Sequence, residues 1–392
     1  MSANATLWHQ RRRHELDWLR VLAFALLILY HIGMAYVGDW GWHIKSRYQS
    51  DGLQNLMLWS NQWRMSLLFM ISGAAVSYQL QCDSSWLFFN RSAQRLLLPL
   101  LFGSLVIVAP QAFVELKVKG YIPATGYLSF WRDYLGLGEP LPAAYGRLEP
   151  THITWNHLWY LAYLFVFISI LWILYPLIIR ARRLALWLNQ HAGATAVYLL
   201  PIILLFLIGE LLWEKFPTTH LLLDDWYTHA RYFSVFFIGF ALVRSNKLWA
   251  VLQTHRQLSL LLALASYASI VFYAHGGHLS HYLTWMAPLE APLRGWVWSA
   301  NSWLWIMAIT GYAQVWWQRP HPLIQKANQG VYCYYILHQT FIVLTLYGLG
   351  RYALDPIIEP LLLTAITLVG CTIGYLLARR LPYGRSLLGI KS

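Results

Sequence analysis

Long apolar runs separated by short polar connections dominate the chain. Ten of these runs are long enough to cross about 30 Å of hydrocarbon at about 1.5 Å per residue. They lie at 18–37, 55–78, 96–116, 155–179, 196–214, 230–244, 258–275, 295–317, 330–350 and 357–378. The pattern predicts an all-α, polytopic membrane protein with about ten transmembrane helices. Since no connection is long enough to separate domains, residues 1–392 are expected to form a single integral-membrane domain.

The predicted connections include an N-terminal tail at about 1–15 and a long loop at about 117–154. The loop is rich in Gly and Pro, which indicates an ordered or re-entrant segment rather than a separate domain. The run that follows Arg11-Arg12-Arg13 has no small-residue cleavage site, so we expect the first span to be retained.

The composition excludes several classes of protein. Of the 392 residues, 58% are hydrophobic and 11% are charged, whereas soluble domains are about a quarter charged. Such a chain cannot cover a water-facing surface, which excludes a soluble enzyme, a disordered chain and a coiled coil. The three cysteines, Cys82, Cys333 and Cys371, show no CxxC spacing, so neither a zinc site nor a disulfide framework is indicated.

The net charge of +13 is explained by its distribution along the chain. With ten spans, both termini lie on one side of the membrane, together with the loops at 79–95, 180–195, 244–257 and 318–329. That side carries 18 of the 29 Lys and Arg residues but only 3 of the 16 acidic residues. By the positive-inside rule this side is cytoplasmic. Topology accounts for the charge, so no nucleic-acid partner is expected.

Three ionisable residues share one face of the first predicted span. From Arg20 to His31 the helix advances about 16 Å and about 20° past three full turns, and Asp17 lies three residues before Arg20. Alone, Arg20 is explained by snorkelling to the headgroups and His31 by packing in a core. Three such residues on one stripe favour a functional site, because ionisable groups are costly at membrane depth.

Other basic residues lie near the second and third spans. Arg91 and Arg95 are i,i+4 neighbours, so they form either a stop-transfer anchor or a clamp for an anion such as phosphate. Arg64 lies within the second span, where it is expected to pair with another group or to contact substrate. The pair Ser72-Gly73 is more typical of close helix packing than of a nucleophile.

Two further histidines lie at or within predicted spans. His157 precedes Trp159 at the outer end of the fourth span, where an aromatic belt explains the Trp but not the His. His338 lies in the middle of the ninth span, and taken alone it is more typical of a structural residue.

A histidine triplet at His275, His278 and His281 resembles a metal site only superficially. Gly276-Gly277 interrupts any helix there, and the sequence places no Cys or carboxylate close by. No metal is therefore expected.

Several short motifs occur in a fixed order along the chain. They are Leu16–Arg20 followed by His31, Phe69–Gly73, Arg91-x3-Arg95-Leu96-x2-Pro99, His157–Leu161 and Tyr335–Gln339. Over about 14–380 this series resembles the integral-membrane acyltransferase 3 family. Trp42-His43 and Trp63–Met65 are similar to the branch that includes the succinyltransferase of periplasmic glucans. The O-antigen acetyltransferase branch differs, because it has a Glu-Glu pair where this chain has Leu161-Ala162-Tyr163.

The resemblance implies transfer of an acyl group from cytoplasmic acyl-CoA to a hydroxyl of an extracytoplasmic glycan, in a bacterial cytoplasmic (inner) membrane. It implies that His31, Arg20 and Asp17 are catalytic and that Arg20, Arg91 and Arg95 bind CoA. It also implies that Arg64, His157, Trp159 and His338 bind substrate. A histidine suits the base role because its ordinary pKa is about 6.5. An aromatic and acidic outer surface would suit sugars, and comprises Trp40, Trp42, Tyr145, Glu149, Trp155, Asp224, Asp225 and Trp226.

Several points stay open at this stage. They include whether acetyl-CoA or succinyl-CoA is the donor, which glycan is the acceptor, and whether His31 carries an acyl intermediate. The protein could be a monomer or a homo-oligomer in the bilayer. A transporter or flippase for a glycan or lipid precursor is the main alternative, and a passive scaffold is the third. The transporter is disfavoured because 1–190 and 191–392 show no internal symmetry.

Overall fold

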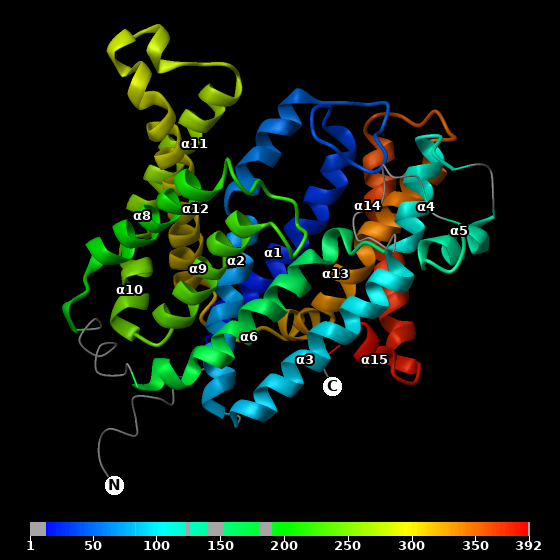
Figure 1. The fold of residues 1–392 in the computed structure, drawn as a ribbon, viewed down its shortest axis with the longest axis horizontal. Helices are drawn as coiled ribbons and strands as arrows, with labels where there is room; N and C mark the ends of the chain where they lie inside the picture. The colour runs from blue at the N-terminus through cyan, green and yellow to red at the C-terminus, as the bar shows by residue number, and fades with distance from the viewer. Residues whose placement is uncertain are drawn as a thin grey trace. The chain divides into compact units, whose positions relative to one another are not determined.

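All regular structure in the described part of the chain is helical. A computed structural model describes residues 13–82, 84–122, 126–139, 141, 153–180 and 190–390. Every element in these ranges is an α-helix or a short 3-10 or π turn (Figure 1), which confirms the all-α prediction. Most of the predicted tail and of the 180–195 loop, and part of the 117–154 loop with Tyr145 and Glu149, lie outside the described residues.

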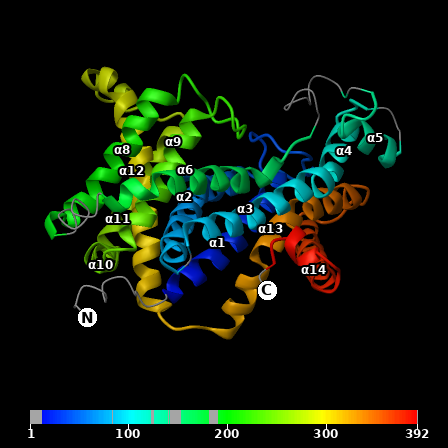
Figure 2. The same ribbon diagram turned by 60° about the horizontal axis from the view of Figure 1, so that its bottom comes forward.

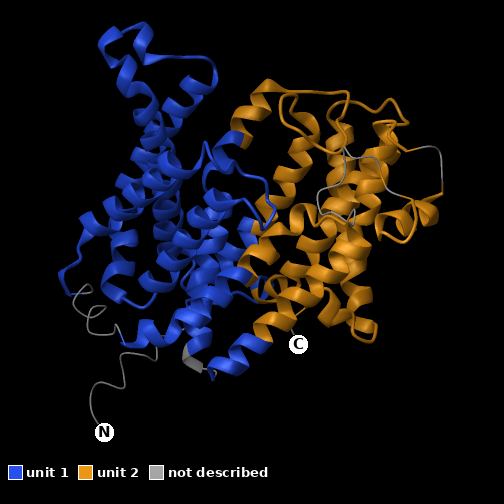
Figure 3. Cartoon of the chain, viewed as in Figure 1, with its two compact units in different colours: residues 1–23, 58–90, 166–324 blue, residues 24–57, 91–165, 325–392 orange. Residues whose placement is uncertain are grey.

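The chain divides into two compact units, and each is built from three separate segments (Figure 3). Unit 1 comprises Met1–Ala23, Leu58–Asn90 and Val166–Ile324. Unit 2 comprises Phe24–Met57, Arg91–Phe165 and Gln325–Ser392.

Unit 1 contains the helices of the middle of the chain. Here α12 packs along α11, and it also contacts α8 and α10 (Figure 2). The helices wholly within unit 1 are α8 (Ala194–Leu212), α9 (Trp226–Leu242), α10 (Asn246–Thr254), α11 (Arg256–Ala274), η4 (Leu279–His281), η5 (Thr284–Met286) and α12 (Ala287–Trp316). Most of α2 (Asp51–Cys82) and α6 (Trp159–Arg180) and the first half of α1 (His14–Gly33) also belong to it.

Two glycines bring α2 and α9 into close contact in unit 1. A Cβ atom on Gly73 would overlap the backbone carbonyl of Phe236, and one on Gly239 would overlap that of Met70. The interpretation of Ser72-Gly73 as a packing site is therefore confirmed.

Unit 2 contains the second half of α1 and most of the helices that lie outside unit 1. They are η1 (Met34–Tyr36), most of α3 (Ser85–Phe102), η2 (Gly103–Ile107), α4 (Ala109–Val118), α5 (Tyr127–Tyr134), η3 (Asn156–Leu158), most of α13 (Pro322–Leu349), α14 (Ile358–Arg380) and α15 (Gly384–Leu387). The π turn η2 interrupts the long segment between Pro99 and Pro110, which is where prolines break the helical hydrogen-bond ladder. α4 and α5 share a small apolar core that includes Ala112, Phe130 and Tyr134.

Each of the ten predicted spans coincides with a helix. Fewer than ten of these helices, however, are both long enough and apolar enough to cross a membrane. Six segments of the described chain are long and apolar enough to cross a membrane, and the pair α9 and α10, bent by 109°, would make a seventh. The other three predicted spans correspond to α2, α12 and α13, which are 32, 30 and 28 residues long. These helices fall short because they carry many polar, Trp and Tyr side chains. By length and composition, six or seven helices of the described chain could cross a membrane, which is fewer than the predicted number of about ten.

Three of the predicted connections, at 79–95, 244–257 and 318–329, are largely helical. The sequence placed a loop at 79–95, whereas α2 continues to Cys82 and α3 already begins at Ser85. The prediction was wrong because it equated the end of the apolar run with the end of the helix. Arg91 and Arg95 therefore lie together on α3, as their i,i+4 spacing predicted.

The glycine contact in unit 1 gives a prediction about stability. Gly73→Ala should lower the unfolding free energy by about 1–3 kcal/mol, the usual cost of overpacking, because its Cβ has no room against Phe236. Thermal unfolding in detergent measures this change. Gly209→Ala is the matched control, since Gly209 is also in a helix of unit 1 and a Cβ there meets no atom within 4 Å. Equal melting temperatures for both variants would contradict the close contact.

Candidate active site

The last turn of α1 places His31 against α13 in unit 2. Nδ1 of His31 lies 2.7 Å from Nε2 of His338. The two rings are within 11° of parallel, and their centroids are 5.0 Å apart, which is the arrangement of an in-plane hydrogen bond rather than a face-to-face stack. His338 is fully buried.

The backbone of α13 determines which nitrogen atoms carry protons. Nδ1 of His338 lies 2.6 Å from the carbonyl oxygen of Tyr335 and 3.2 Å from that of Tyr334. Because a carbonyl only accepts, Nδ1 of His338 must be the donor, and in the neutral ring Nε2 is then an acceptor. His31 must therefore donate from Nδ1, which leaves the lone pair of neutral His31 on Nε2. This is the tautomer that a general base requires.

A third histidine, His157, lies beside this pair. It is positioned by the 3-10 turn η3, which is entered through a positive φ of 40° at Asn156. The ring centroid of His157 is 5.0 Å from that of His338 and 6.5 Å from that of His31. Nε2 of His157 donates to the carbonyl of Ile336 at 3.1 Å, so its Nδ1 is an acceptor. Nδ1 is buried and has no partner in the described part of the chain.

The loop after α1 covers the histidines with an aromatic ring. The ring of Trp42 stacks on His31 at a centroid distance of 5.4 Å. Its Nε1–H group is buried and finds no acceptor among the described residues. A buried donor without an acceptor is costly, so this group is a candidate to bind an oxygen atom of a substrate.

A chain of polar groups runs from Gln339, the neighbour of His338 on α13, to α4. The side-chain amide of Gln339 donates to Nε2 of His43 at 2.8 Å, and Nδ1 of His43 lies 2.5 Å from Oε2 of Glu115. The same amide also reaches Oε1 of Gln111 at 3.2 Å, which accepts from Asn156 as well. Gln111 and Glu115 are i,i+4 neighbours on α4, a signal in the sequence that our reasoning missed.

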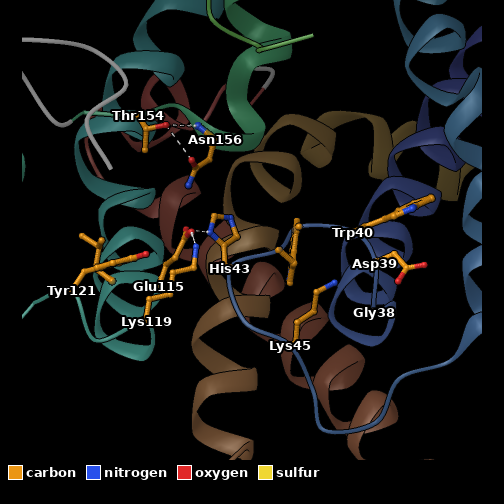
Figure 4. Close-up of a pocket in the computed structure, with 13 residues that line it drawn as sticks. Gly38, Asp39, Trp40, His43, Lys45, Glu115, Lys119, Tyr121, Thr154 and Asn156 are labelled. Atoms are coloured by element: carbon orange, nitrogen blue, oxygen red, sulfur yellow. Dashed lines mark hydrogen bonds and ion pairs between the residues drawn. The ribbon is translucent and has the colours of Figure 1, made fainter. Parts of the chain in front are cut away.

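The polar chain ends at a cavity of about 650 Å³ in unit 2 (Figure 4). Its wall is formed by the loop after η1, by the end of α4 and by residues next to η3. Glu115 also pairs with Lys119 at 2.5 Å. Burial lowers the pKa of the Lys45 ammonium group in this wall, and the Asp39 carboxylate opposes that shift.

The other predicted site residues occupy separate places. The Asp17–Arg20 pair is confirmed, because Oδ1 and Nη1 lie 3.7 Å apart on the half of α1 that belongs to unit 1. In unit 2 the guanidinium of Arg95 lies over the ring of Tyr332 at 4.9 Å, and Arg91 is exposed.

Arg64 belongs to unit 1 and Trp159 to unit 2. Arg64 is only 4% exposed. Its Nη1 is 3.5 Å from Oγ of Ser60. Trp159 begins α6 and packs edge-on against Tyr163. Arg231 of α9 is partly buried, and it donates to the hydroxyl of Tyr227 at 2.6 Å. We overlooked Arg231 in the sequence, although its position in a predicted span was a signal.

We expected no carboxylate close to the histidine triplet, and this expectation was wrong. Oε1 of Glu290, which is distant in sequence, lies 3.4 Å from Nδ1 of His278, and the carboxylate also accepts from the backbone of Leu279. The described residues contain no group of three or more His, Cys, Asp or Glu side chains that could hold a metal ion.

The fold and the site together define a polytopic, all-α membrane protein with a partly buried histidine pair beside a polar cavity. A family model described as an acyltransferase domain matches residues 13–378. The chain therefore belongs to the integral-membrane acyltransferase 3 family, and it is a membrane enzyme that transfers acyl groups other than aminoacyl groups. No curated protein and no solved structure matches it.

The histidine pair gives a prediction about positioning. His338→Phe keeps a ring of similar size but removes the acceptor for His31, so kcat should fall by roughly 10- to 100-fold, the usual effect of losing such a supporting contact. The donor KM should stay unchanged, and His338→Gln should recover part of kcat because its amide oxygen can accept. Steady-state kinetics and a thermal melt of each variant measure these effects.

A different pattern would show that His338 only packs. In that case the Phe variant would keep kcat, or both variants would lose activity in proportion to their loss of stability.

Proposed function

We propose that the enzyme moves an acetyl or succinyl group from cytoplasmic acyl-CoA to a hydroxyl of an extracytoplasmic glycan, in a bacterial inner membrane. The observation that supports the chemistry best is the hydrogen bond from Nδ1 of His31 to Nε2 of His338, which leaves a basic lone pair on Nε2 of His31. Membership of an enzyme family favours this function over the transporter, flippase and scaffold alternatives.

In the proposed reaction His31 is the general base. Its Nε2 takes the proton of the acceptor hydroxyl while the hydroxyl oxygen attacks the carbonyl carbon of the thioester. The new C–O bond forms as the C–S bond breaks, and the proton passes from His31 to the departing CoA thiolate. The Nε1–H group of Trp42 is a suitable donor for the oxygen that becomes negative during this step, because oxyanions are stabilised by preorganised donors.

The donor is proposed to be held by arginines, because guanidinium groups suit the phosphates of CoA. The proposed residues are Arg20 on α1 and Arg91 and Arg95 on α3. His157, whose Nδ1 has no partner among the described residues, is proposed to bind the acceptor hydroxyl. Arg64 and Trp159 keep their predicted role of substrate contact, and Asp17, which pairs with Arg20, keeps its predicted catalytic role.

The base role gives the first prediction of this section. His31→Ala should insert and bind acyl-CoA normally, yet transfer should fall about 10²- to 10⁴-fold, the usual cost of removing a general base. Arg20→Ala should lose donor binding as well as rate. Thiol release from acyl-CoA and direct CoA binding measure the two effects.

His281→Ala serves as the control, since His281 is an exposed histidine of η4 in unit 1. If His31→Ala is folded and keeps more than roughly a tenth of wild-type transfer, His31 is not the base.

The donor clamp gives a second prediction. Arg91→Gln and Arg95→Gln should each raise the acyl-CoA KM by roughly tenfold or more, because a charged hydrogen bond contributes about 1.5–3 kcal/mol. The acceptor KM should change little. Arg385→Gln, at an exposed position of α15, is the control. A lower melting temperature of Arg95→Gln with an unchanged donor KM would show that Arg95 only packs on Tyr332.

The proposed topology gives a third prediction. In a cysteine-free background, Leu137→Cys in the segment after α5 should react with a membrane-impermeant maleimide added to intact cells. Tyr383→Cys before α15 should react only after the membrane is opened. Both side chains are exposed in the structure, so a difference in labelling reports the side of the membrane. The opposite pattern would invert the assignment of both termini to the cytoplasm.

A further inference from the structure

The cavity in unit 2 has the chemistry of a site for an uncharged polyhydroxyl ligand. Two carboxylates and two ammonium groups line it, and each already has a partner in the protein. Glu115 pairs with His43 and Lys119, and Asp39 accepts from Nε2 of Gln54 at 3.1 Å. Lys45 donates to the backbone carbonyls of Met34 and Val37. The lining is formally balanced, so it offers no excess charge to hold a polyphosphate.

The remaining lining groups suit a sugar ring. Trp40 and Trp42 contribute aromatic side chains, and Tyr121 is half-exposed at the wall. Sugars present C–H groups to aromatic rings and hydroxyl groups to carboxylates and amides, which Glu115 and Asn156 supply. The volume of about 650 Å³ is within the usual range of ligand sites.

The loop that forms this wall is held in place by hydrogen bonds within unit 2. The backbone N–H of Ser46 donates to Ala35 at 2.9 Å, and its hydroxyl donates to the buried carboxylate of Glu359 at 2.6 Å. The hydroxyl of Tyr48 donates to the carbonyl of Leu354 at 2.5 Å. Ligand binding therefore requires little ordering of the loop, so the cavity is a preorganised site.

Trp42 connects the cavity with the reacting group. It lines the cavity, and its ring also stacks on His31. A sugar in the cavity would thus lie one aromatic ring away from the proposed base. We propose that this cavity is the acceptor subsite, which binds an uncharged sugar residue next to the one that receives the acyl group. The acceptor assignment rests on the proposed function, whereas the chemistry of the cavity does not.

The kinetic test uses Trp40, which lines the cavity but is not placed in the histidine cluster. With a linear glucose hexasaccharide as acceptor, Trp40→Ala should raise the acceptor KM by about tenfold, the ratio that ~1.4 kcal/mol gives. The donor KM and the slow hydrolysis of acyl-CoA without acceptor should stay unchanged. Trp40→Phe should restore most of the acceptor affinity, and Trp285→Ala, an exposed Trp of unit 1, should behave as wild type.

A binding test works without turnover. In a cysteine-free background, Lys119→Cys at the cavity wall is labelled with a maleimide. The hexasaccharide should slow this labelling, and CoA should not. If wild type shows no acceptor-dependent thiol release but the hexasaccharide still protects, the proposed function fails and the sugar site stands.

Two results would overturn the proposal. One is an acceptor KM that stays within about twofold in a folded Trp40→Ala enzyme that transfers normally. The other is protection of Lys119→Cys by CoA in place of the hexasaccharide, which would make the cavity a donor site.

Discussion

The hydrogen bond between His31 and His338 couples the end of α1 to the middle of α13, and the surrounding groups are arranged around it. His338 is buried and its Nδ1 is committed to the backbone of α13, so its Nε2 can only accept. An unsatisfied polar group in such an interior is costly. The backbone of α13 therefore determines the tautomer of His338, and the hydrogen bond in turn determines that of His31. The ring of Trp42 stacks on His31, and the ring of His157 packs edge-to-face against His338.

The sequence predicted the helices and the residues that are costly in lipid, because both are local properties. Apolar runs located a helix for each predicted span, and the i,i+3 spacing predicted the contact between Asp17 and Arg20. The sequence did not predict contacts between residues that are far apart along the chain, because these contacts depend on tertiary packing. His31 and His338 are 307 positions apart, and His43 and Glu115 are 72 apart. His338 therefore looked structural when read alone, although it contacts the residue we regard as the base.

The charged groups of the chain show two different arrangements. The carboxylates and ammonium groups of the cavity are compensated by each other and by backbone carbonyls. Arg91 and Arg95 are two guanidinium groups on one helix, α3, and Arg95 also lies over the ring of Tyr332. On our proposal, this contrast separates a site for an uncharged sugar from a site for a polyanionic donor. Such a division would let one enzyme hold two chemically unlike substrates without competition between them.

The protonation of His31 tests the central claim most directly. In protein labelled with ¹⁵N-histidine and reconstituted in lipid, solid-state NMR distinguishes protonated from unprotonated ring nitrogens, and His31→Gln assigns the signals of His31. At a pH where the enzyme is active, we predict that Nδ1 of His31 is protonated and hydrogen-bonded to His338 and that Nε2 is unprotonated. The signals of His31 should change in His338→Phe. A neutral His31 with its proton on Nε2, or signals unaffected by that substitution, would contradict the account.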